Sequence, residues 1–204
     1  MSLHIAMLSV HTCPLAALGG KETGGMNVYA RELSRELGRM GVDVDVFTRS
    51  QNPAVPRVVA LGERARVIHV VAGPQAPIPR ERVVDHLDDF ADGVEAWRMV
   101  RGAEYDLIHA HYWLSGVVGL ALRERWGAPV VQMFHTLGRL KNSVARAAAD
   151  LEPVVRLAEE ERLVASVDRI VAATAVERRH LGLYYGADPA RIAVIPCGVD
   201  TALF

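Results

Sequence analysis

Three apolar runs in this chain each end on side chains that can bind or orient a polar substrate. Imidazole, phenol and hydroxyl groups donate and accept hydrogen bonds, and imidazoles also move protons near neutral pH. The runs, with the polar residues that follow them, are 4–10 with His11, 105–110 with His111 and Tyr112, and 129–134 with His135 and Thr136. If the runs are parallel strands, their ends meet at one edge of a sheet, where α/β proteins bind ligands. The sequence therefore predicts a substrate site built from three strand ends.

A pair of glycines, Gly24 and Gly25, follows the first run and leads into residues 26–40, which have helical spacing. Glycine lets the backbone approach a ligand closely, and a helix amino terminus offers unpaired N–H groups and the positive end of its dipole. This order predicts a site for a phosphate or a developing negative charge. A Gly-Gly pair before a helix is also ordinary turn chemistry, and the loop matches neither G-x-G-x-x-G nor the P-loop pattern.

Two histidine positions allow more than one interpretation. His109 and His111 alternate along a strand, so they face the same side and could form a metal pair, but no further ligands with suitable spacing are evident. We therefore expect no metal site, with His109 packed in the strand and His111 at the rim. By position alone, His135 is either a ligand contact or a hydrogen-bonded structural histidine.

Charged residues supply the remaining candidates. Arg139, Lys141 and Arg146 form a basic loop, which is either a solvated face or an extension of the proposed anion site. Arg156 lies among glutamates on an expected helix, where i,i+4 ion pairs are the default, and the acidic run 159–161 is expected to face solvent. No nucleophile has an evident base and no carboxylate pair lies at the rim, so binding and electrostatics are favoured over hydrolysis.

The elements that must position these residues alternate along the chain. Apolar runs predict strands and apolar residues at three- and four-residue spacing predict helices. The expected strands are 4–11, 42–47, 58–61, 67–71, 105–110, 129–134, 169–173 and 192–195, and the expected helices are 26–40, 80–101, 114–125, 151–166 and one after Thr174. This alternation predicts an α/β fold, a Rossmann-like doubly wound parallel sheet with helices on both faces.

Composition limits the possible classes. The 204 residues, 50% of them hydrophobic, are sufficient for one compact domain. A net charge of -1 gives no reason to expect a nucleic acid partner or an anionic membrane surface, so any basic site is local. No run is long enough to insert stably into a membrane. The two cysteines, Cys13 and Cys197, lack a metal-ligand spacing and are far apart, which favours a cytoplasmic location.

Four motifs carry a family resemblance. They are HTCPL at 11–15, GGMNVY at 24–29, HAHYWLSG at 109–116 and FHTLGRLKN at 134–142. Together they resemble the N-terminal half of a retaining GT-B glycosyltransferase of family 4, similar to the sucrose-phosphate synthase and D-inositol-3-phosphate glycosyltransferase group. The resemblance implies that residues 1–204 form the acceptor-binding domain, and that segment 195–204 leads toward a nucleotide-sugar-binding domain absent from this chain.

The resemblance also implies roles for residues at the donor. Gly25 and Asn27 would border the donor diphosphate and the acceptor, and the loop with Gly24 would lie at the transferred sugar. His135 would contact that sugar, so Gly25 and His135 are the expected catalytic residues. His11, at the same edge, is expected to bind substrate.

A phosphorylated acceptor is implied by a second group of positions. Tyr112, Thr136 and Arg156 match residues that hold the phosphate of an inositol phosphate, and Lys141 matches a lysine of the sucrose-phosphate synthase-like members. Arg80 stands where the inositol-phosphate enzymes carry lysine, which keeps the charge and changes the donor geometry.

The leading hypothesis is thus transfer of a sugar from a nucleotide sugar to a phosphorylated sugar or polyol, without a cofactor and with no turnover by these 204 residues alone. One alternative is a family member that uses a neutral or lipid-linked acceptor. Another is a non-catalytic, small-anion-binding Rossmann-like module.

Overall fold

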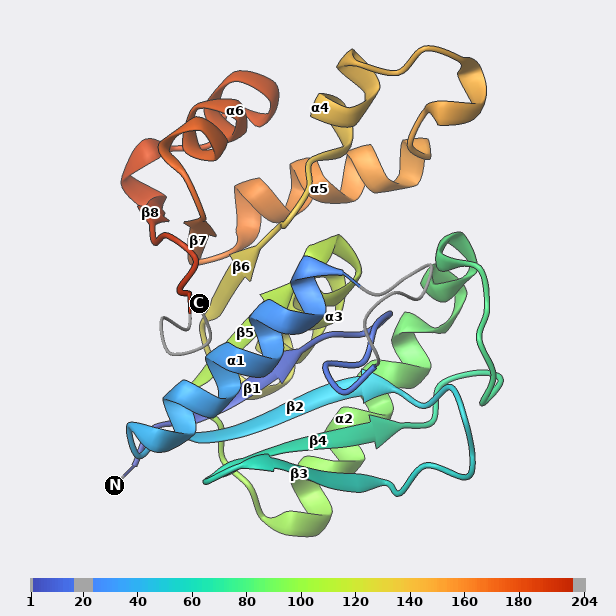
Figure 1. The fold of residues 1–204 in the computed structure, drawn as a ribbon, viewed down its shortest axis with the longest axis vertical. Helices are drawn as coiled ribbons and strands as arrows, with labels where there is room; N and C mark the ends of the chain where they lie inside the picture. Colours follow the sequence, from blue (N-terminus) through green and yellow to red (C-terminus); the bar gives the residue numbers. More distant parts are fainter. Residues whose placement is uncertain (1, 17–23, 200–204) are drawn as a thin grey trace.

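The computed structural model describes residues 2–16 and 24–199, and these form one eight-stranded sheet with helices packed around it (Figure 1). The strands are β1 (His4–Leu8), β2 (Asp43–Arg49), β3 (Val58–Gly62), β4 (Ala65–Val70), β5 (Leu107–His111), β6 (Val130–Met133), β7 (Arg169–Ala172) and β8 (Ile192–Val194). The α-helices are α1 (Gly25–Arg39), α2 (Leu87–Arg101), α3 (Tyr112–Trp126), α4 (Gly138–Ser143), α5 (Val154–Ser166) and α6 (Ala175–Tyr185). Short 3-10 helices span Arg80–His86, Ala148–Asp150 and Pro189–Arg191.

The strand order is β3-β4-β2-β1-β5-β6-β7-β8, and every neighbouring pair except β3 and β4 is parallel. The chain moves outward from β1 through β2 in one direction and returns to β5 on the other side. The order therefore reverses between β1 and β5, which places a topological switch point at their carboxyl ends.

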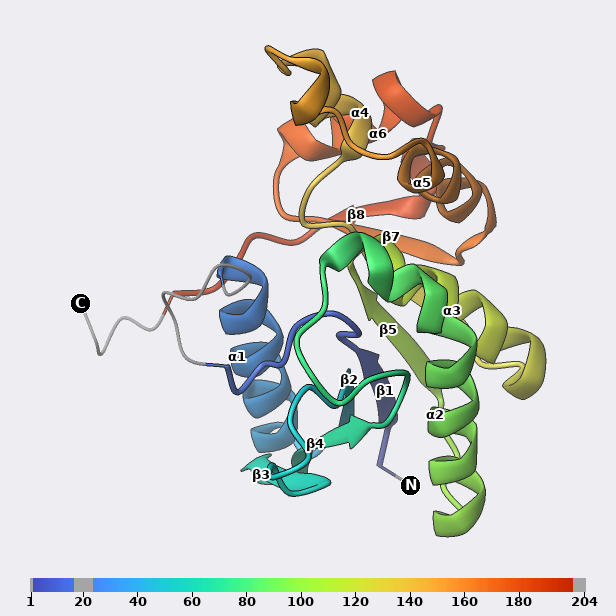
Figure 2. The same ribbon diagram turned by 90° about the vertical axis from the view of Figure 1, so that its right-hand side faces the viewer.

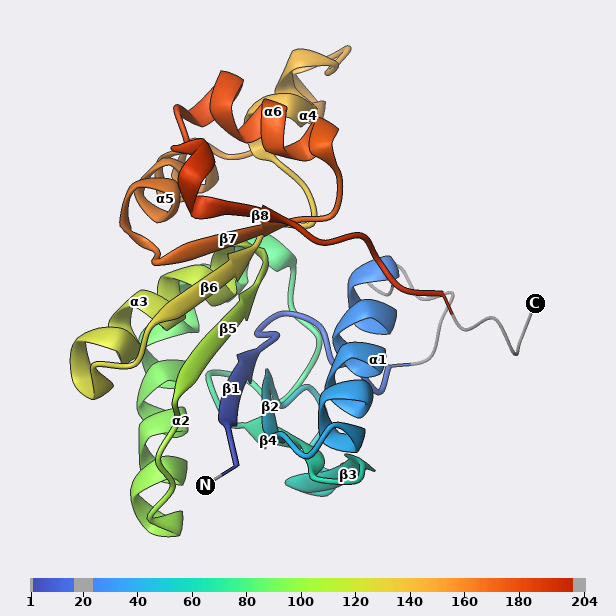
Figure 3. The same ribbon diagram turned by 90° about the vertical axis from the view of Figure 1, so that its left-hand side faces the viewer.

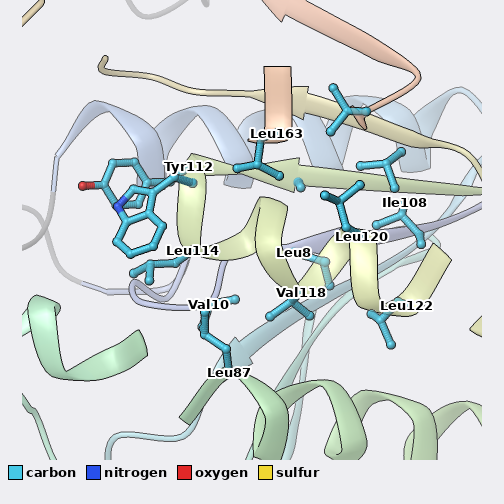
Figure 4. Close-up of a cluster of buried hydrophobic side chains, with 14 of the residues drawn as sticks. Leu8, Val10, Leu87, Ile108, Tyr112, Leu114, Val118, Leu120, Leu122 and Leu163 are labelled. Atoms are coloured by element: carbon cyan, nitrogen blue, oxygen red, sulfur yellow. The ribbon is translucent and has the colours of Figure 1, made fainter. Parts of the chain in front are cut away.

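Helices cover both faces, as the doubly wound prediction requires (Figures 2 and 3). α1 packs on β2, β3 and β4, while α2 and α3 lie on the opposite face, where α3 contacts β1, β5 and β6. Figure 4 shows the core on this second side, in which Leu8, Ile108 and Val118 pack together. Burial of these apolar faces holds the strand ends in fixed relative positions.

The structure corrects the expectation of a wholly parallel sheet. β3 and β4 form an antiparallel hairpin because only Glu63 and Arg64 connect them, and a parallel crossover needs a dozen or more residues. Arg64 has φ 54°, in the left-handed region of a tight turn.

Two helical assignments also differ. The expected helix 80–101 is a 3-10 segment, Arg80–His86, followed by α2, because apolar spacing over one or two turns suits both helix types. The expected basic loop at 139–146 contains α4, which is only six residues long and therefore too short for a periodic pattern. Parts of the predicted glycine loop (17–23) and of the tail toward a second domain (200–204) lie outside the described residues.

Candidate functional site at the carboxyl edge of the sheet

The sheet brings the three predicted strand ends together. Leu8 is in register with Ala110, and His111 is in register with Met133, so β1, β5 and β6 end side by side. Consequently the ring centroids of His11 and Tyr112 lie 4.6 Å apart. Nδ1 of His111 lies 2.9 Å from Nε2 of His135.

Two of these strand ends have an unusual backbone. Tyr112 has φ 74° and His135 has φ 62°, and among the described residues Arg64 is the only other non-glycine with positive φ. The Thr136 N–H donates to the Phe134 carbonyl over 2.7 Å, which closes a γ-turn around His135. Such conformations cost about 1 to 3 kcal/mol each and cluster at functional sites. The strained backbone thus indicates a functional site at this edge, independently of the types of side chain found there.

His111 fixes the protonation of His135. The His111 side chain is fully buried and its Nε2 has no partner. A buried N–H without an acceptor costs more free energy than a buried lone pair without a donor. We therefore assign the proton of the neutral His111 ring to Nδ1, which donates a hydrogen bond to Nε2 of His135. Burial and the nearby His109 lower the pKa of His135 to about 4, so its ring is neutral near pH 7. Its own proton then sits on Nδ1, where it can be donated to a ligand.

Four predicted residues line one pocket of about 490 Å³ at this edge. They are Arg80, Tyr112, Lys141 and Arg156, and they come from the 3-10 segment, α3, α4 and α5. The acidic residues Glu81, Asp150 and Glu152 also line the pocket. The structure therefore groups the expected cations, although with carboxylates among them.

Arg156 is the most fully engaged of these cations. The residue is 1% exposed, its Nε donates to Glu160 over 2.7 Å, and its NH1 lies 2.8 Å from Oε2 of Glu152. NH2 donates to both the carbonyl and the hydroxyl oxygen of Thr136 at 3.0 Å. The guanidinium lies 4.9 Å from the Tyr112 ring centroid. The i,i+4 ion pairs expected for Arg156 are confirmed on both sides of it.

The expectation that residues 159–161 face solvent is wrong for Glu160, which is fully buried. Its carboxylate accepts from Arg156, from the Gly138 N–H over 2.8 Å, and from the Tyr185 hydroxyl. The backbone at Gly138 packs closely against α5, since a Cβ there would lie 2.7 Å from a methyl group of Leu157. Sequence reasoning also missed Glu152, although both glutamates stand four residues from Arg156, a spacing that could have identified them.

The remaining cations differ in their freedom. Lys141 pairs with the other oxygen of Glu152, and its side chain is 44% exposed. The side chain of Arg80 makes no hydrogen bond or ion pair with any residue in the described part of the chain. Arg80 is thus the uncompensated cation of the pocket, and its charge contributes, after burial, to holding the pKa of His11 down at about 3.

The glycine pair begins α1 next to the histidines. Gly24 is the N-cap and Gly25 the first helical residue, and a Cβ on either would meet no described atom within 4 Å. Asn27 is buried in the first turn, where its amide accepts from the Thr12 hydroxyl over 2.9 Å and donates to the Cys13 carbonyl over 2.8 Å. Asn27 therefore ties the loop after β1 to α1. Tyr29, one turn on, packs its ring 5.5 Å from that of His135.

Two general features complete the description. No group of three histidine, cysteine or acidic residues within 2–16 and 24–199 is arranged to hold a metal ion. Within the same ranges, no helix is both long enough and apolar enough to cross a bilayer.

A doubly wound sheet with polar side chains gathered at its switch point defines a Rossmann-like ligand-binding domain. The family model described as Glycosyltransferase Family 4 matches residues 23–203. The chain belongs to this family.

Comparison with individual proteins agrees with the family assignment. The chain is 44% identical over 201 residues to D-inositol 3-phosphate glycosyltransferase 2 of Catenulispora acidiphila, covering 98% of this chain and 47% of that protein. The structure of sucrose-phosphate synthase from Thermosynechococcus elongatus superposes with a TM-score of 0.92 at 34% identity, covering 99% of this chain and 50% of the other. The catalytic domain of starch synthase IV from Arabidopsis thaliana, at 13% identity and a TM-score of 0.63, shares the fold, over 99% of this chain and 53% of the other. The chain spans about half the length of the curated relatives it matches.

Proposed function

We propose that this chain is the acceptor-binding half of a retaining glycosyltransferase that moves a sugar from a nucleotide sugar to a phosphorylated sugar or polyol. The observation that carries the proposal is the pocket lined by Arg80, Lys141 and Arg156 at the carboxyl edge of the sheet. Cations bind phosphate through charge-assisted hydrogen bonds, which are stronger than neutral ones. The names of the relatives, which include a phosphorylated polyol and a sugar phosphate, point to the same acceptor class.

In this proposal the acceptor phosphate lies against Arg80 and Lys141, with the Tyr112 hydroxyl as a further contact. Thr136, expected to bind the phosphate, does not line this pocket, and its hydroxyl accepts from NH2 of Arg156 at 3.0 Å. Arg156 is buried beneath the pocket. Its ion pairs with the glutamates and its hydrogen bonds to Thr136 keep the wall of the pocket in place. The acceptor is thereby oriented toward the histidines at the ends of β5 and β6.

The donor side of the proposal uses the start of α1. The sugar being transferred lies between the Gly24–Gly25 turn and His135, whose Nδ1–H donates to it, with His11 beside the acceptor. Retention without a protein nucleophile requires stabilisation of the leaving diphosphate, and helix amino-terminal N–H groups supply part of it. We place most of the nucleotide-sugar site in a second domain, and Asn27 shapes the loop between donor and acceptor. The cytoplasmic location and the absence of a nucleic acid partner stay predictions.

Calorimetric titration with inositol phosphate, fructose 6-phosphate and their unphosphorylated counterparts tests the acceptor class. We expect binding of a phosphorylated compound, weakened at least about tenfold in Arg80→Gln because one charge-assisted contact is lost. Arg82→Gln is the matched control, since Arg82 is exposed and paired with Asp85. Equal binding of the neutral counterpart would instead favour a neutral or lipid-linked acceptor.

Sugar transfer distinguishes the enzyme from a non-catalytic anion-binding module. The protein that includes the natural downstream sequence is assayed with nucleotide sugars and the phosphorylated compound found by calorimetry. Transfer supports the enzyme, and ligand binding without transfer from any nucleotide sugar supports the module.

A further inference from the structure

Glu152 lies between two of the cations that line the pocket, Lys141 and Arg156. One carboxylate oxygen pairs with Lys141 and the other lies 2.8 Å from NH1 of Arg156. The residue is 8% exposed and lines the pocket, and its backbone N–H is held by the Asn142 side chain over 2.8 Å. A negative group therefore already occupies the position from which both cations can be reached.

The charge state of Glu152 at neutral pH follows from its neighbours. Burial alone would raise its pKa, but the contacts with Lys141 and Arg156 outweigh burial and hold the pKa below its ordinary value. The carboxylate is thus ionised at pH 7. Lys141 and Arg156 are thus balanced by Glu152 and Glu160, and among the described cations that line the pocket only Arg80 has no ion pair.

We propose that Glu152 limits the affinity of the pocket for phosphate by competing with the acceptor phosphate for Lys141, while its second oxygen stays paired with the buried Arg156. A phosphate entering the pocket meets a like charge at hydrogen-bond distance from the same donors, and like-charge juxtaposition opposes binding. This inference rests on the proposed function, and it adds that the pocket binds phosphate more weakly than its arginine and lysine content indicates. The penalty is common to all phosphorylated compounds, so free inorganic phosphate, which has no sugar or polyol contacts to offset the repulsion, is left with the weakest binding.

A purely structural role for Glu152 predicts the opposite result on substitution. If the carboxylate only holds Arg156 in place, its loss loosens the pocket and weakens binding. If the carboxylate competes, its loss strengthens binding even though the protein itself becomes less stable. Arg156 keeps its pair with Glu160 in either case, so the pocket wall retains one ion pair.

The test compares Glu152→Gln with wild type by calorimetric titration with inorganic phosphate, fructose 6-phosphate and fructose. Gln keeps the shape and removes the charge. Glu161→Gln is the matched control, because Glu161 is on α5, the helix that follows Glu152, is exposed and pairs with Arg139 outside the pocket. We expect the dissociation constants of fructose 6-phosphate and of inorganic phosphate both to fall about tenfold in Glu152→Gln, with no change for fructose or in the control.

Lys141→Gln, alone and combined with Glu152→Gln, completes a double-mutant cycle. If the Glu152 carboxylate and the phosphate compete for Lys141, the increase in phosphate affinity caused by Glu152→Gln is smaller in the Lys141→Gln background. Thermal melting of each variant verifies that it is folded, and a melting temperature that rises more with phosphate in Glu152→Gln than in wild type gives the same information independently of calorimetry.

The outcomes separate the two proposals. Binding by wild type that is unchanged or weakened in Glu152→Gln overturns the competition and leaves the proposed function intact. Binding that appears only in Glu152→Gln supports the competition. Failure of wild type and Glu152→Gln alike to bind any phosphorylated compound overturns both.

Discussion

The two ends of the sheet bury charge in different ways. At the amino ends of the strands, the buried Asp45 of β2 accepts from Arg66 at 2.6 and 3.0 Å, from the Tyr105 hydroxyl at 2.7 Å and from Trp97 at 3.4 Å. His4 approaches the same carboxylate at 3.5 Å. Every oxygen of this carboxylate is paired, and the backbone around it is regular strand.

The carboxyl edge is less complete. Seven buried side-chain nitrogen or oxygen atoms have neither a hydrogen bond nor an ion pair within residues 2–16 and 24–199, and all seven belong to residues in the middle or carboxyl half of a strand or just beyond it. They belong to His11, Thr48, Arg49, His109, His111, Tyr112 and Gln132. Native proteins pair nearly all buried polar atoms, so unpaired atoms at this edge, and the two residues with left-handed backbone, lower the stability of the fold. A ligand-binding role for this edge accounts for that loss of stability. At the amino ends of the strands the buried carboxylate is fully paired, whereas the carboxyl edge keeps polar atoms unpaired and available to a ligand.

The largest expected effect on stability comes from replacing one arginine at each end of the sheet. Arg156→Met removes the partner of two buried carboxylates and should lower the free energy of unfolding by about 3 to 5 kcal/mol. Arg66→Met should cost less, because the Arg66 side chain is 39% exposed and Asp45 keeps Tyr105 and Trp97. Urea denaturation measures both. An equal or larger cost for Arg66→Met would break the comparison.

Acid should act first on the carboxyl edge. Burial lowers the pKa of His109 to about 4, below its ordinary 6.5, so the unfolded chain binds the proton first as the pH falls. Stability is therefore fully present above pH 6.5 and is lost as the pH falls toward 4, by about 2 kcal/mol for this residue between pH 7 and pH 5. His109→Asn should flatten that part of the profile, measured by denaturation at each pH. A profile unchanged by the substitution would contradict the assignment.

The amino end should lose stability only in stronger acid. Burial opposes ionisation of Asp45, but hydrogen bonds from His4, Arg66 and Tyr105 outweigh it and hold the pKa of Asp45 below its ordinary value. The contribution of Asp45 to the stability of the fold is therefore present above about pH 4 and is lost below it. Asp45→Asn should cost about 1 to 2 kcal/mol at pH 7, because the amide cannot accept from every donor. Phosphate affinity, measured by calorimetry, should not change. A changed affinity would show that the two ends are coupled.

Much of the fold was accessible from local pattern. Apolar runs located the strands, and glycines and polar residues after them located the edge where the site lies. The β3–β4 hairpin, the 3-10 start before α2 and the six-residue α4 were missed because short segments carry too little periodicity to define pairing or helix type.

The sequence by itself determined the alternation of strands and helices, the family motifs, and the residue types at the strand ends, because these depend on neighbours close along the chain. Only the tertiary structure decided which cations are free. Arg80, Lys141 and Arg156 carry the same formal charge in the sequence, yet Arg156 is held by two glutamates, Lys141 by one, and Arg80 by none in the described part of the chain. The physical reason is that burial makes ion pairing obligatory, and burial depends on which distant segments pack together.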